Sequence, residues 1–475
     1  MKKLSELYDI DSDVLIKDIS INSKECHEGS LFVCTMGVKV DRHDFIDDAI
    51  NHGAVAIVAS KDVTASVPVV KVENTNEELP KLCDKFYDYP GRSLTMIGVT
   101  GTDGKTTTST LIQRLLGKDI CGLTGTNGLN IGDYSEDTPN TTADAPYLYR
   151  YFRTFIEKGA KYACMEASSE AFFRGRLTEM MWDVTGYTNI TRDHLNIHKT
   201  IENYAECKIQ LFKQTKKDGY CVLNHDDKFF EMAKAACNGH VLTYGKGEDN
   251  DLVIKDFKLH PDHTDITYIL NGEEFIINSP LLAEFNVYNL ACAILMVTCL
   301  GVTKEQIKER LVGFHVDGRM EVIKKNTPYH VIVDYAHTPN GIKCLLDFVN
   351  TLDINRSIVV IGSAGTRDAE KRPIMGSIVC ENASYGIFTY EDPRTEDPME
   401  ICKQIVSEVS KTRDNFEIVV DRHEAIEKAI MMAGDNDIVL VLGKGNEDYE
   451  IIGTEEIPFN DVDEVIKAIE KREKN

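Results

Sequence analysis

Short apolar runs alternate with longer stretches of helical periodicity along most of this 475-residue chain. The runs at 96–99 and 330–333 are continuous and rich in branched residues, which is typical of strands buried on both faces. Between several such runs, apolar residues recur every three or four positions, which indicates amphipathic helices. Strands that alternate with helices predict mostly parallel sheets covered on both faces. We therefore expect an α/β fold.

The pattern divides the chain into three parts, which agrees with about 150 residues per domain. Residues 1–91 predict a small α/β domain that ends in a linker at Pro90 and Gly91. Residues 92–318 and 319–475 each predict a larger sheet domain. The expected strands are 30–37, 54–60, 96–101, 120–126, 161–169, 184–190, 220–227, 330–339, 357–368, 385–393, 416–420 and 436–445, with a hairpin at 264–277 and a buried helix at 285–301.

A glycine turn at 101–104 joins the first strand of the central domain to a helix start. Glycine lets backbone N–H groups approach an anion closely, and a helix N-terminus carries partial positive charge. Lys105 would reach the outer phosphates of a nucleotide, and Thr106 would offer its hydroxyl to Mg²⁺. Gly98 lies one position too early for the common phosphate-loop spacing, so the turn alone is also compatible with an ordinary strand-to-helix connection.

Composition excludes several classes of partner. The net charge of −24 disfavours nucleic acid and anionic membranes, which need a basic face. Thirteen cysteines without a C-x-x-C pair indicate reduced thiols in a cytoplasmic protein, not a disulfide framework. The N-terminus lacks the apolar segment of a signal peptide, and the apolar run 290–302 is too short to span a membrane.

Three polar residues of the central domain are candidates for metal chemistry. Glu166 ends a strand, where a carboxylate either holds Mg²⁺ or is simply solvated. His194 and His198 are four apart and could share a helix face, but no H-E-x-x-H pattern supports zinc, so a magnesium-shell or catalytic role for His194 fits better. Lys208 is either a surface lysine or a partly buried amine. A buried amine loses its proton easily and can add CO₂ to give a metal-binding carbamate.

The last domain offers groups for a nucleotide and an amino acid. Asp334 follows an apolar strand and could accept hydrogen bonds from ribose, while Arg319 stands at the domain boundary within reach of phosphate. Arg367 and Arg394 lie on separate loops, where arginine can clamp a carboxylate. Carboxylates that could hold an ammonium are Glu391, Asp392 and Glu447.

Ten ordered stretches resemble the Mur ligase family over nearly the whole chain, most closely its MurE-type branch. They are TGTDGKTTT, NTTADA, MEASSEAFFRGRL, TNITRDHLNIHKTIENYAECKIQLF, FNVYN, GRME, VDYAHTP, GSAGTRDAEKRPIMG, EDPRTEDP and GKGNEDYEIIG. The resemblance implies a central P-loop-type parallel-sheet ATPase domain, flanked by a small N-terminal α/β domain that binds the UDP substrate and a Rossmann-like C-terminal domain that binds the amino acid.

The resemblance also implies an activity. The family uses ATP to add an amino acid to a nucleotide-linked muropeptide in peptidoglycan synthesis, through an acyl phosphate. For this chain it implies meso-diaminopimelate or L-lysine joined to UDP-MurNAc-L-Ala-D-Glu, with ATP, Mg²⁺ and a carbamylated Lys208. We expect a cytoplasmic monomer with no nucleic-acid or membrane partner.

Family positions carry over to individual residues. The ATP-binding positions are Gly101, Thr102, Asp103, Gly104, Lys105, Thr106, Thr107, Asn286, Arg319 and Asp334. The metal-shell positions are Thr106, Glu166, His194 and Lys208, and Lys105, Glu166, His194 and Lys208 are the catalytic ones. The substrate positions are Ser23, His43, Thr141, Thr142, Ser168, Arg176, Arg367, Asp392, Arg394, Gly443 and Glu447.

The chain departs from the family's usual residues where substrates would bind. Examples are Asn22, Ala143, Glu170, Asp392 and Asn446. These departures keep open a Mur-ligase paralogue that joins an amino acid to a different carboxylate, such as a glutamyl peptide or a specialised metabolite. A nucleotide-binding regulatory protein without catalysis is a third hypothesis, against which the intact ATP and metal positions argue.

Overall fold

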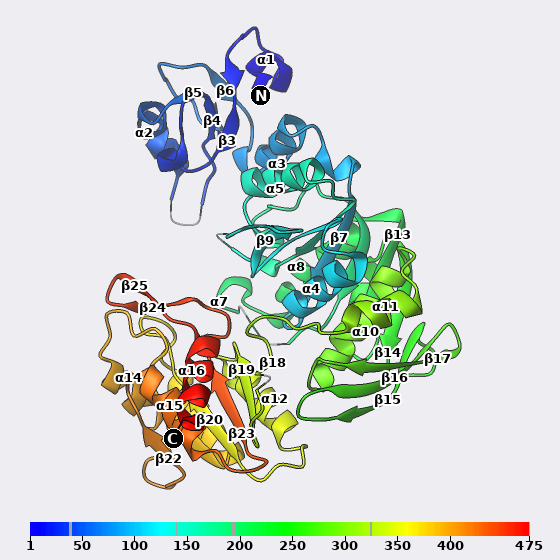
Figure 1. The fold of residues 1–475 in the computed structure, drawn as a ribbon. Helices are drawn as coiled ribbons and strands as arrows, with labels where there is room; N and C mark the ends of the chain where they lie inside the picture. Colours follow the sequence, from blue (N-terminus) through cyan, green and yellow to red (C-terminus); the bar gives the residue numbers. More distant parts are fainter. Residues whose placement is uncertain (38–39, 139, 192, 194, 324, 475) are drawn as a thin grey trace. The chain divides into compact units, whose positions relative to one another are not determined.

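The structure is a computed structural model that describes residues 1–37, 40–138, 140–191, 193, 195–323 and 325–474 (Figure 1). The chain divides into two compact units. The first comprises Met1–Ile254, Ile269–Glu273 and Tyr288–Arg310, and the second comprises Lys255–Tyr268, Glu274–Val287 and Leu311–Asn475.

The first unit begins with a small parallel sheet of order β3-β4-β5-β6. Its elements are β1 (Lys2–Lys3), α1 (Leu4–Leu7), β2 (Leu15–Ile16), β3 (Asp18–Ser20), η1 (Ser23–Glu25), β4 (Ser30–Val33), η2 (Arg42–Phe45), α2 (Ile46–Asn51), β5 (Ala54–Ala59), β6 (Val69–Lys71), α3 (Thr75–Phe86) and η3 (Pro90–Arg92). The predicted strands at β4 and β5 are confirmed. Pro90 and Gly91, where the linker is expected, lie in a turn of 3₁₀-helix that is closed by a hydrogen bond from Ser93 N to Pro90 O.

The central sheet has the strand order β10-β9-β8-β11-β7-β12-β13-β14-β15-β16-β17. Strands β8, β11, β7, β12, β13, β14 and β15 pair in parallel, as the alternation of strands and helices predicts. The elements are β7 (Thr95–Thr100), α4 (Lys105–Leu116), β8 (Cys121–Gly125), β9 (Gly128–Ile131), β10 (Tyr134–Glu136), α5 (Ala145–Glu157), β11 (Tyr162–Glu166), α6 (Ser169–Phe173), β12 (Trp182–Tyr187), α7 (Leu195–His198), α8 (Ile201–Lys213), β13 (Thr215–Asn224), α9 (Phe230–Ala236), β14 (His240–Gly245), β15 (Leu252–Leu259), β16 (Thr264–Leu270), β17 (Glu273–Ser279), α10 (Glu284–Thr298) and α11 (Lys304–Leu311).

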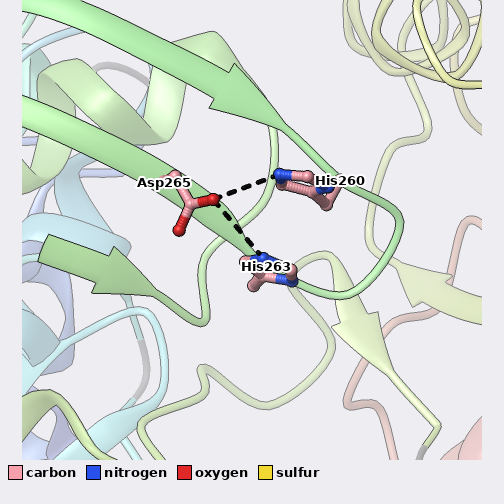
Figure 2. A group of neighbouring side chains, drawn as sticks. All are labelled: His260, His263 and Asp265. Atoms are coloured by element: carbon pink, nitrogen blue, oxygen red, sulfur yellow. Dashed lines mark ion pairs between the residues drawn. The ribbon is translucent and has the colours of Figure 1, made fainter.

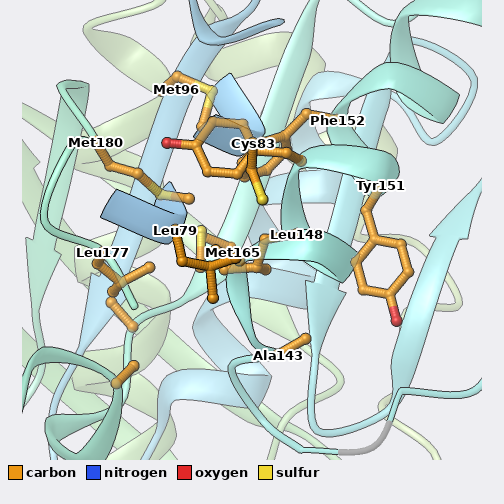
Figure 3. Close-up of a cluster of buried hydrophobic side chains, with 14 of the residues drawn as sticks. Leu79, Cys83, Met96, Ala143, Leu148, Tyr151, Phe152, Met165, Leu177 and Met180 are labelled. Atoms are coloured by element: carbon orange, nitrogen blue, oxygen red, sulfur yellow. The ribbon is translucent and has the colours of Figure 1, made fainter. Parts of the chain in front are cut away.

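A buried apolar cluster joins the N-terminal sheet region to the central sheet within the first unit (Figure 3). Leu79 and Cys83 come from α3 and Phe152 comes from α5, and both helices pack together. Met96 on β7 and Met165 on β11 lie in the same cluster. Because α3 and α5 share this core with β7 and β11, the two parts of the unit are held to each other by apolar burial.

The second unit contains a six-stranded sheet of order β18-β19-β23-β20-β21-β22, parallel except for β18. The elements are β18 (Glu321–Val322), β19 (His330–Asp334), α12 (Pro339–Val349), β20 (Ser357–Ile361), α13 (Lys371–Asn382), β21 (Tyr385–Phe388), α14 (Pro398–Ile405), β22 (Phe416–Ile418), α15 (Arg422–Met432), β23 (Ile438–Leu442), β24 (Tyr449–Ile452), β25 (Glu455–Pro458) and α16 (Asp461–Glu473). Apolar residues on its two faces form two separate cores. The doubly wound arrangement predicted for this part is confirmed.

Two further features concern the helices and the cysteines. Within the described ranges, every helix is too short or too polar to traverse a lipid bilayer. All thirteen cysteines carry free thiols, and most are buried.

Candidate active site

The glycine turn between β7 and α4 packs tightly against side chains of two neighbouring segments. Gly104 has φ +82°, and a Cβ there would lie 2.1 Å from Asn289 Oδ1. A Cβ on Gly101 would lie 1.8 Å from Thr188 Oγ1. Only glycine fits at both positions, so the backbone of the turn lies against these neighbouring side chains and leads directly into the N-terminus of α4.

Lys105 folds back over this turn. Its Nζ donates to Gly101 O at 2.9 Å and to Thr102 O at 2.7 Å. Thr102 in turn accepts a hydrogen bond from Thr191 N, and Asp103 N donates to Asn189 Oδ1. The ammonium therefore lies at the concave side of the turn, beside the amides that would contact an anion.

Glu166 lies next to the turn because β11 pairs in parallel with β7, so both strands end at the same edge. The carboxylate is buried. Oε2 accepts from Thr106 Oγ1 at 3.1 Å and from Thr126 Oγ1 at 3.2 Å, and Oε1 accepts from Thr126 N at 2.9 Å. A carboxylate and two hydroxyls gathered beside a phosphate-type turn form an oxygen donor set of the kind that Mg²⁺ prefers.

Lys208 is almost completely buried, with 2% of its surface exposed. Its Nζ donates to Gly101 O at 2.6 Å and lies 4.6 Å from the centre of the Tyr204 ring. Burial, together with the nearby Lys105 ammonium, holds the pKa of Lys208 well below its usual value. The structure thus decides between the two interpretations of this side chain: it is a buried amine at the turn, not a surface lysine.

The histidine pair is described only in part, since His194 lies outside the described residues. His198 is buried at the end of α7, and its Nε2 lies 3.1 Å from Ser169 Oγ. Its ring contacts those of Phe173 and Tyr204. His198 thus packs into the wall of the site through its ring.

A hydrogen-bond network connects the predicted muropeptide positions to Glu166. Thr142 Oγ1 donates to Glu166 O at 2.7 Å and accepts from Ser168 N at 3.1 Å. Arg176 donates to Thr142 O at 2.9 Å and forms an ion pair with Asp144. Thr141 contacts Thr126, 3.1 Å away, which itself binds Glu166. Arg176 also lines a cavity of about 880 Å³.

The two predicted uridine-region residues are placed differently. Ser23, in η1, lines a cavity of about 370 Å³ together with Asn22 and Arg42. His43 is buried, its Nδ1 lies 2.6 Å from Asp41 Oδ1, and its Nε2 accepts from Ser60 N at 3.1 Å. Both ring nitrogens of His43 are therefore engaged within the domain, and the residue orders the loop that carries Arg42.

In the second unit, Asp334 ends β19 and is buried, which raises its pKa. Its oxygens accept from Met320 N at 2.7 Å and from Ala336 N at 2.8 Å. The Arg319 guanidinium lies 4.5 Å from the centre of the Tyr335 ring. Asp334 thus fixes the backbone that presents Arg319. The predicted adenine contact, Asn286, is buried and donates to Leu282 O at 2.8 Å.

A buried lysine organises the carboxylates of the C-terminal loops. Lys444 Nζ donates to Asp392 Oδ1 at 2.9 Å and to Glu447 Oε2 at 2.8 Å. Glu391 is buried behind them, and burial raises the pKa of both Glu391 and Glu447. A Cβ on Gly443 would lie 3.0 Å from Glu391 Oε2. Lys444 thus bridges Asp392 and Glu447, while Arg422, Lys371 and Lys444 all act on Glu391, so these loops combine acceptors for an ammonium group with several cations.

The two predicted clamp arginines differ in how firmly they are held. Arg394 has φ +53°, and its backbone bonds to Ile451 O and to Gly453 N. Its Nε is buried and has no hydrogen-bond partner among the described residues. Arg367 is exposed on the loop after β20.

Comparisons with known proteins agree over the whole chain. Three family models match in order: "Mur ligase family, catalytic domain" at residues 15–96, "Mur ligase middle domain" at 99–297 and "Mur ligase, glutamate ligase domain" at 318–445. A UDP-N-acetylmuramoyl-L-alanyl-D-glutamate–2,6-diaminopimelate ligase from Oceanobacillus iheyensis is 36% identical over 498 residues, covering 99% of both chains. The chain belongs to the Mur ligase family.

Other relatives of this Mur ligase carry the same name or the same fold. A protein of that name from Bacillus cereus is 38% identical, covering 97% of this chain and 95% of the relative. A solved structure of a ligase of that name superposes with a TM-score of 0.72 at 29% identity, covering 99% of both chains. The MurF ligase from Thermotoga maritima in complex with ADP shares the fold, with a TM-score of 0.66 at 21% identity, covering 97% of this chain and 99% of that one.

Sequence reasoning missed three residues of this Mur ligase that contact predicted site residues. Lys444 lies between Asp392 and Glu447, although its position in a Gly-Lys-Gly turn after an apolar strand was a usable signal. Thr126 binds Glu166 through both its backbone and its hydroxyl. The Tyr204 ring faces Lys208, one helical turn away on α8, so that i, i+4 spacing could have revealed it.

Proposed function

We propose that this Mur ligase uses ATP to join 2,6-diaminopimelate to UDP-N-acetylmuramoyl-L-alanyl-D-glutamate, through an acyl phosphate. The observation that carries the proposal is the cluster formed by the glycine turn, Lys105, Glu166 and Lys208. The substrates follow the names of full-length relatives at 36–38% identity, which are 2,6-diaminopimelate ligases.

The residues around the turn fit a nucleotide and Mg²⁺. Gly101 and Gly104 let the turn pack against Thr188 and Asn289, which holds its backbone beside the N-terminus of α4. Thr106 and Glu166 would supply oxygen ligands to Mg²⁺, with His194 in its shell. When bound, Mg²⁺ neutralises charge on the transferring phosphoryl group. A carbamate on Lys208 would form when the neutral amine adds to CO₂ and releases a proton, and its oxygens would join the same donor set.

The chemical problem is that a carboxylate is a poor electrophile. In the proposed reaction a carboxylate oxygen of the muropeptide attacks the γ-phosphorus of ATP, and the bond to the bridging oxygen breaks to release ADP. Lys105 and the turn amides would offset the charge that develops on the phosphoryl oxygens. The amine of the second substrate then attacks the acyl carbon, inorganic phosphate leaves, and the nitrogen loses a proton. Thr142, Ser168 and Arg176 would orient the muropeptide.

For the amino acid we propose the C-terminal loops. Asp392 and Glu447 would hold an ammonium, and Arg394 would clamp a carboxylate with its buried, unpartnered Nε. The Arg394 Nε favours diaminopimelate as the substrate, because the distal end of diaminopimelate carries a carboxylate that lysine lacks. L-Lysine is the second candidate, because the carboxylate of Asp392 adds negative charge that suits a plain ammonium.

We further propose domain boundaries at 91/92 and 318/319 and a cytoplasmic monomer as the working form. The net charge of −24 and the thirteen free thiols support that compartment. Ser23 and the cavity beside it are proposed for the uridine end of the substrate.

A substrate panel tests this proposal. Purified protein with Mg-ATP and UDP-MurNAc-L-Ala-D-Glu is given meso-diaminopimelate, L-lysine and other amino acids, and phosphate release and product mass are measured. We expect turnover with meso-diaminopimelate. Arg394→Ala should raise its KM about 10- to 100-fold, since a hydrogen bond to a charged group contributes about 1.5–3 kcal/mol, and should leave that of lysine nearly unchanged. Arg413→Ala, an exposed arginine of the same unit, is the matched control.

The alternatives predict other outcomes in the same panel. Turnover with L-lysine alone would move the specificity to that amino acid. Turnover only with a different acyl substrate would favour the paralogue. ATP binding without any turnover would overturn the ligase proposal altogether.

A further inference from the structure

Two histidines and an aspartate meet at the turn between β15 and β16, in the second unit. His260 follows β15, His263 precedes β16, and Asp265 is the second residue of β16. Figure 2 shows the three side chains pointing toward one another. Among the described residues, this is the only group of three His, Cys, Asp or Glu side chains whose ligand atoms lie close enough together to hold one metal ion. The proposed ligase reaction makes no use of them.

The donor atoms have the separations of a metal's ligand shell. Asp265 Oδ2 lies 3.2 Å from His260 Nε2 and 3.8 Å from His263 Nε2, and the three ligand atoms all lie within 4.8 Å of one another. Tetrahedral zinc with bonds of about 2.0–2.1 Å separates its ligand atoms by about 3.3 Å. One ion could therefore reach the three side chains after shifts of well under the length of one bond.

Neighbouring groups orient two of the ligands as they do around protein-bound metals. His263 Nδ1 lies 2.7 Å from Asp262 Oδ1, which places the proton on Nδ1 and leaves the Nε2 lone pair facing the cluster. Asn278 Nδ2 donates to Asp265 Oδ1 at 2.8 Å, which leaves Oδ2 to face the histidines. A backbone hydrogen bond from His260 N to His263 O, 2.9 Å long, fixes the turn itself.

An ion pair with Asp265 does not by itself explain the surroundings of His260. Its Nε2 is buried and makes no hydrogen bond to any described residue, although it lies 3.2 Å from Asp265 Oδ2. The two imidazoles also stack in parallel, with centres 4.2 Å apart and planes 7° apart. Both imidazoles present a ring nitrogen that can ligate a cation.

We propose that His260, His263 and Asp265 bind one divalent transition metal of the Zn²⁺ class, with water completing the shell. Imidazole ligands favour Zn²⁺, Co²⁺ or Ni²⁺ over Mg²⁺, so this site is separate from the magnesium proposed for ligation. The ion would brace the β15–β16 turn. The proposal is independent of the proposed function, since it concerns metal binding in the absence of substrates.

Zinc titration of the full chain tests the site. In Mg²⁺-containing buffer without nucleotide, calorimetry should show that His263→Ala and Asp265→Asn each bind one equivalent of Zn²⁺ fewer than the unmodified chain. His52→Ala removes an exposed histidine paired with Asp48 in the first unit and should keep the full stoichiometry. Because stoichiometries are compared, any binding to thiols cancels.

Two further measurements sharpen the result. Asp262→Asn should keep the stoichiometry but weaken Zn²⁺ binding at this site about 10- to 100-fold, since it removes only the group that orients His263. Co²⁺ bound at the site should give ligand-field bands without a thiolate charge-transfer band, and His263→Ala should abolish them. Equal stoichiometry in the unmodified chain and in both ligand variants, with circular dichroism showing all of them folded, would overturn the proposal.

Discussion

Lys105→Ala is expected to lower kcat for ligation by about 10²- to 10³-fold, the usual effect of removing one group that stabilises charge in a transition state. The Lys105 ammonium is held over the turn by Gly101 O and Thr102 O, beside the amides of the α4 N-terminus. Because its proposed role is to offset charge on the transferring phosphoryl group, the loss should appear in kcat much more than in the KM of the amino acid. Initial rates of ADP release at saturating substrates measure it.

Lys118→Ala is the matched control for this loss. Lys118 follows the same helix and pairs with the exposed Asp133 on the surface. We expect unchanged kinetics in that variant. A Lys105→Ala protein that folds normally and keeps its kcat would contradict the assignment of the turn as the phosphate site.

Lys208→Ala is the second change with a large expected effect. Burial lowers the pKa of this amine well below its usual value, which favours the neutral form that can add CO₂. If a carbamate completes the metal shell, the alanine variant should lose ligation by at least about 10²-fold. Short carboxylates such as formate or acetate should restore part of it, because they can occupy the space and supply the missing oxygens.

Lys213→Ala, on the exposed side of the same helix, should remain fully active. A ¹³C NMR signal from protein equilibrated with ¹³CO₂ should show the carbamate directly and should be absent from Lys208→Ala. Full activity of Lys208→Ala without added carboxylate would exclude the carbamate role.

The parts of the fold that the sequence predicted are those where a strong local pattern agrees with the tertiary structure. The apolar runs that form β7, β8, β11, β12 and β13 are buried on both faces. Their continuous apolar composition therefore predicts buried strands. The Asn271-Gly272 turn has positive φ at both residues, as the dipeptide predicts for a two-residue hairpin.

The features that the sequence left out depend on contacts between distant segments. Strands β9 and β10 are short and lie at one end of the sheet, with β10 as the edge strand, so neither is long enough to show a recognisable period. Helical periodicity continues over 398–411, but α14 ends at Ile405 and turns follow, because periodicity alone does not set a helix end.

In the candidate site, too, the sequence predicts individual residues but not the contacts between distant segments. Glu166 could be placed at a strand end from sequence, but only the pairing of β11 with β7 brings it to the turn. Lys208 had two interpretations until its burial was known. Lys444 escaped notice because a lysine in a loop is usually solvated, whereas here two carboxylates from separate loop positions surround it.

In the proposed reaction, ATP activates a substrate carboxylate through an acyl phosphate. Transfer of oxygen from that carboxylate to phosphate is the direct test of this step. UDP-MurNAc-L-Ala-D-Glu labelled with ¹⁸O in the reacting carboxylate is incubated with the protein, Mg-ATP and meso-diaminopimelate, and the inorganic phosphate is analysed by mass spectrometry. We expect one ¹⁸O atom in each phosphate released and one amide product for each ADP. Phosphate without ¹⁸O, or ADP formed without an amide product, would contradict it.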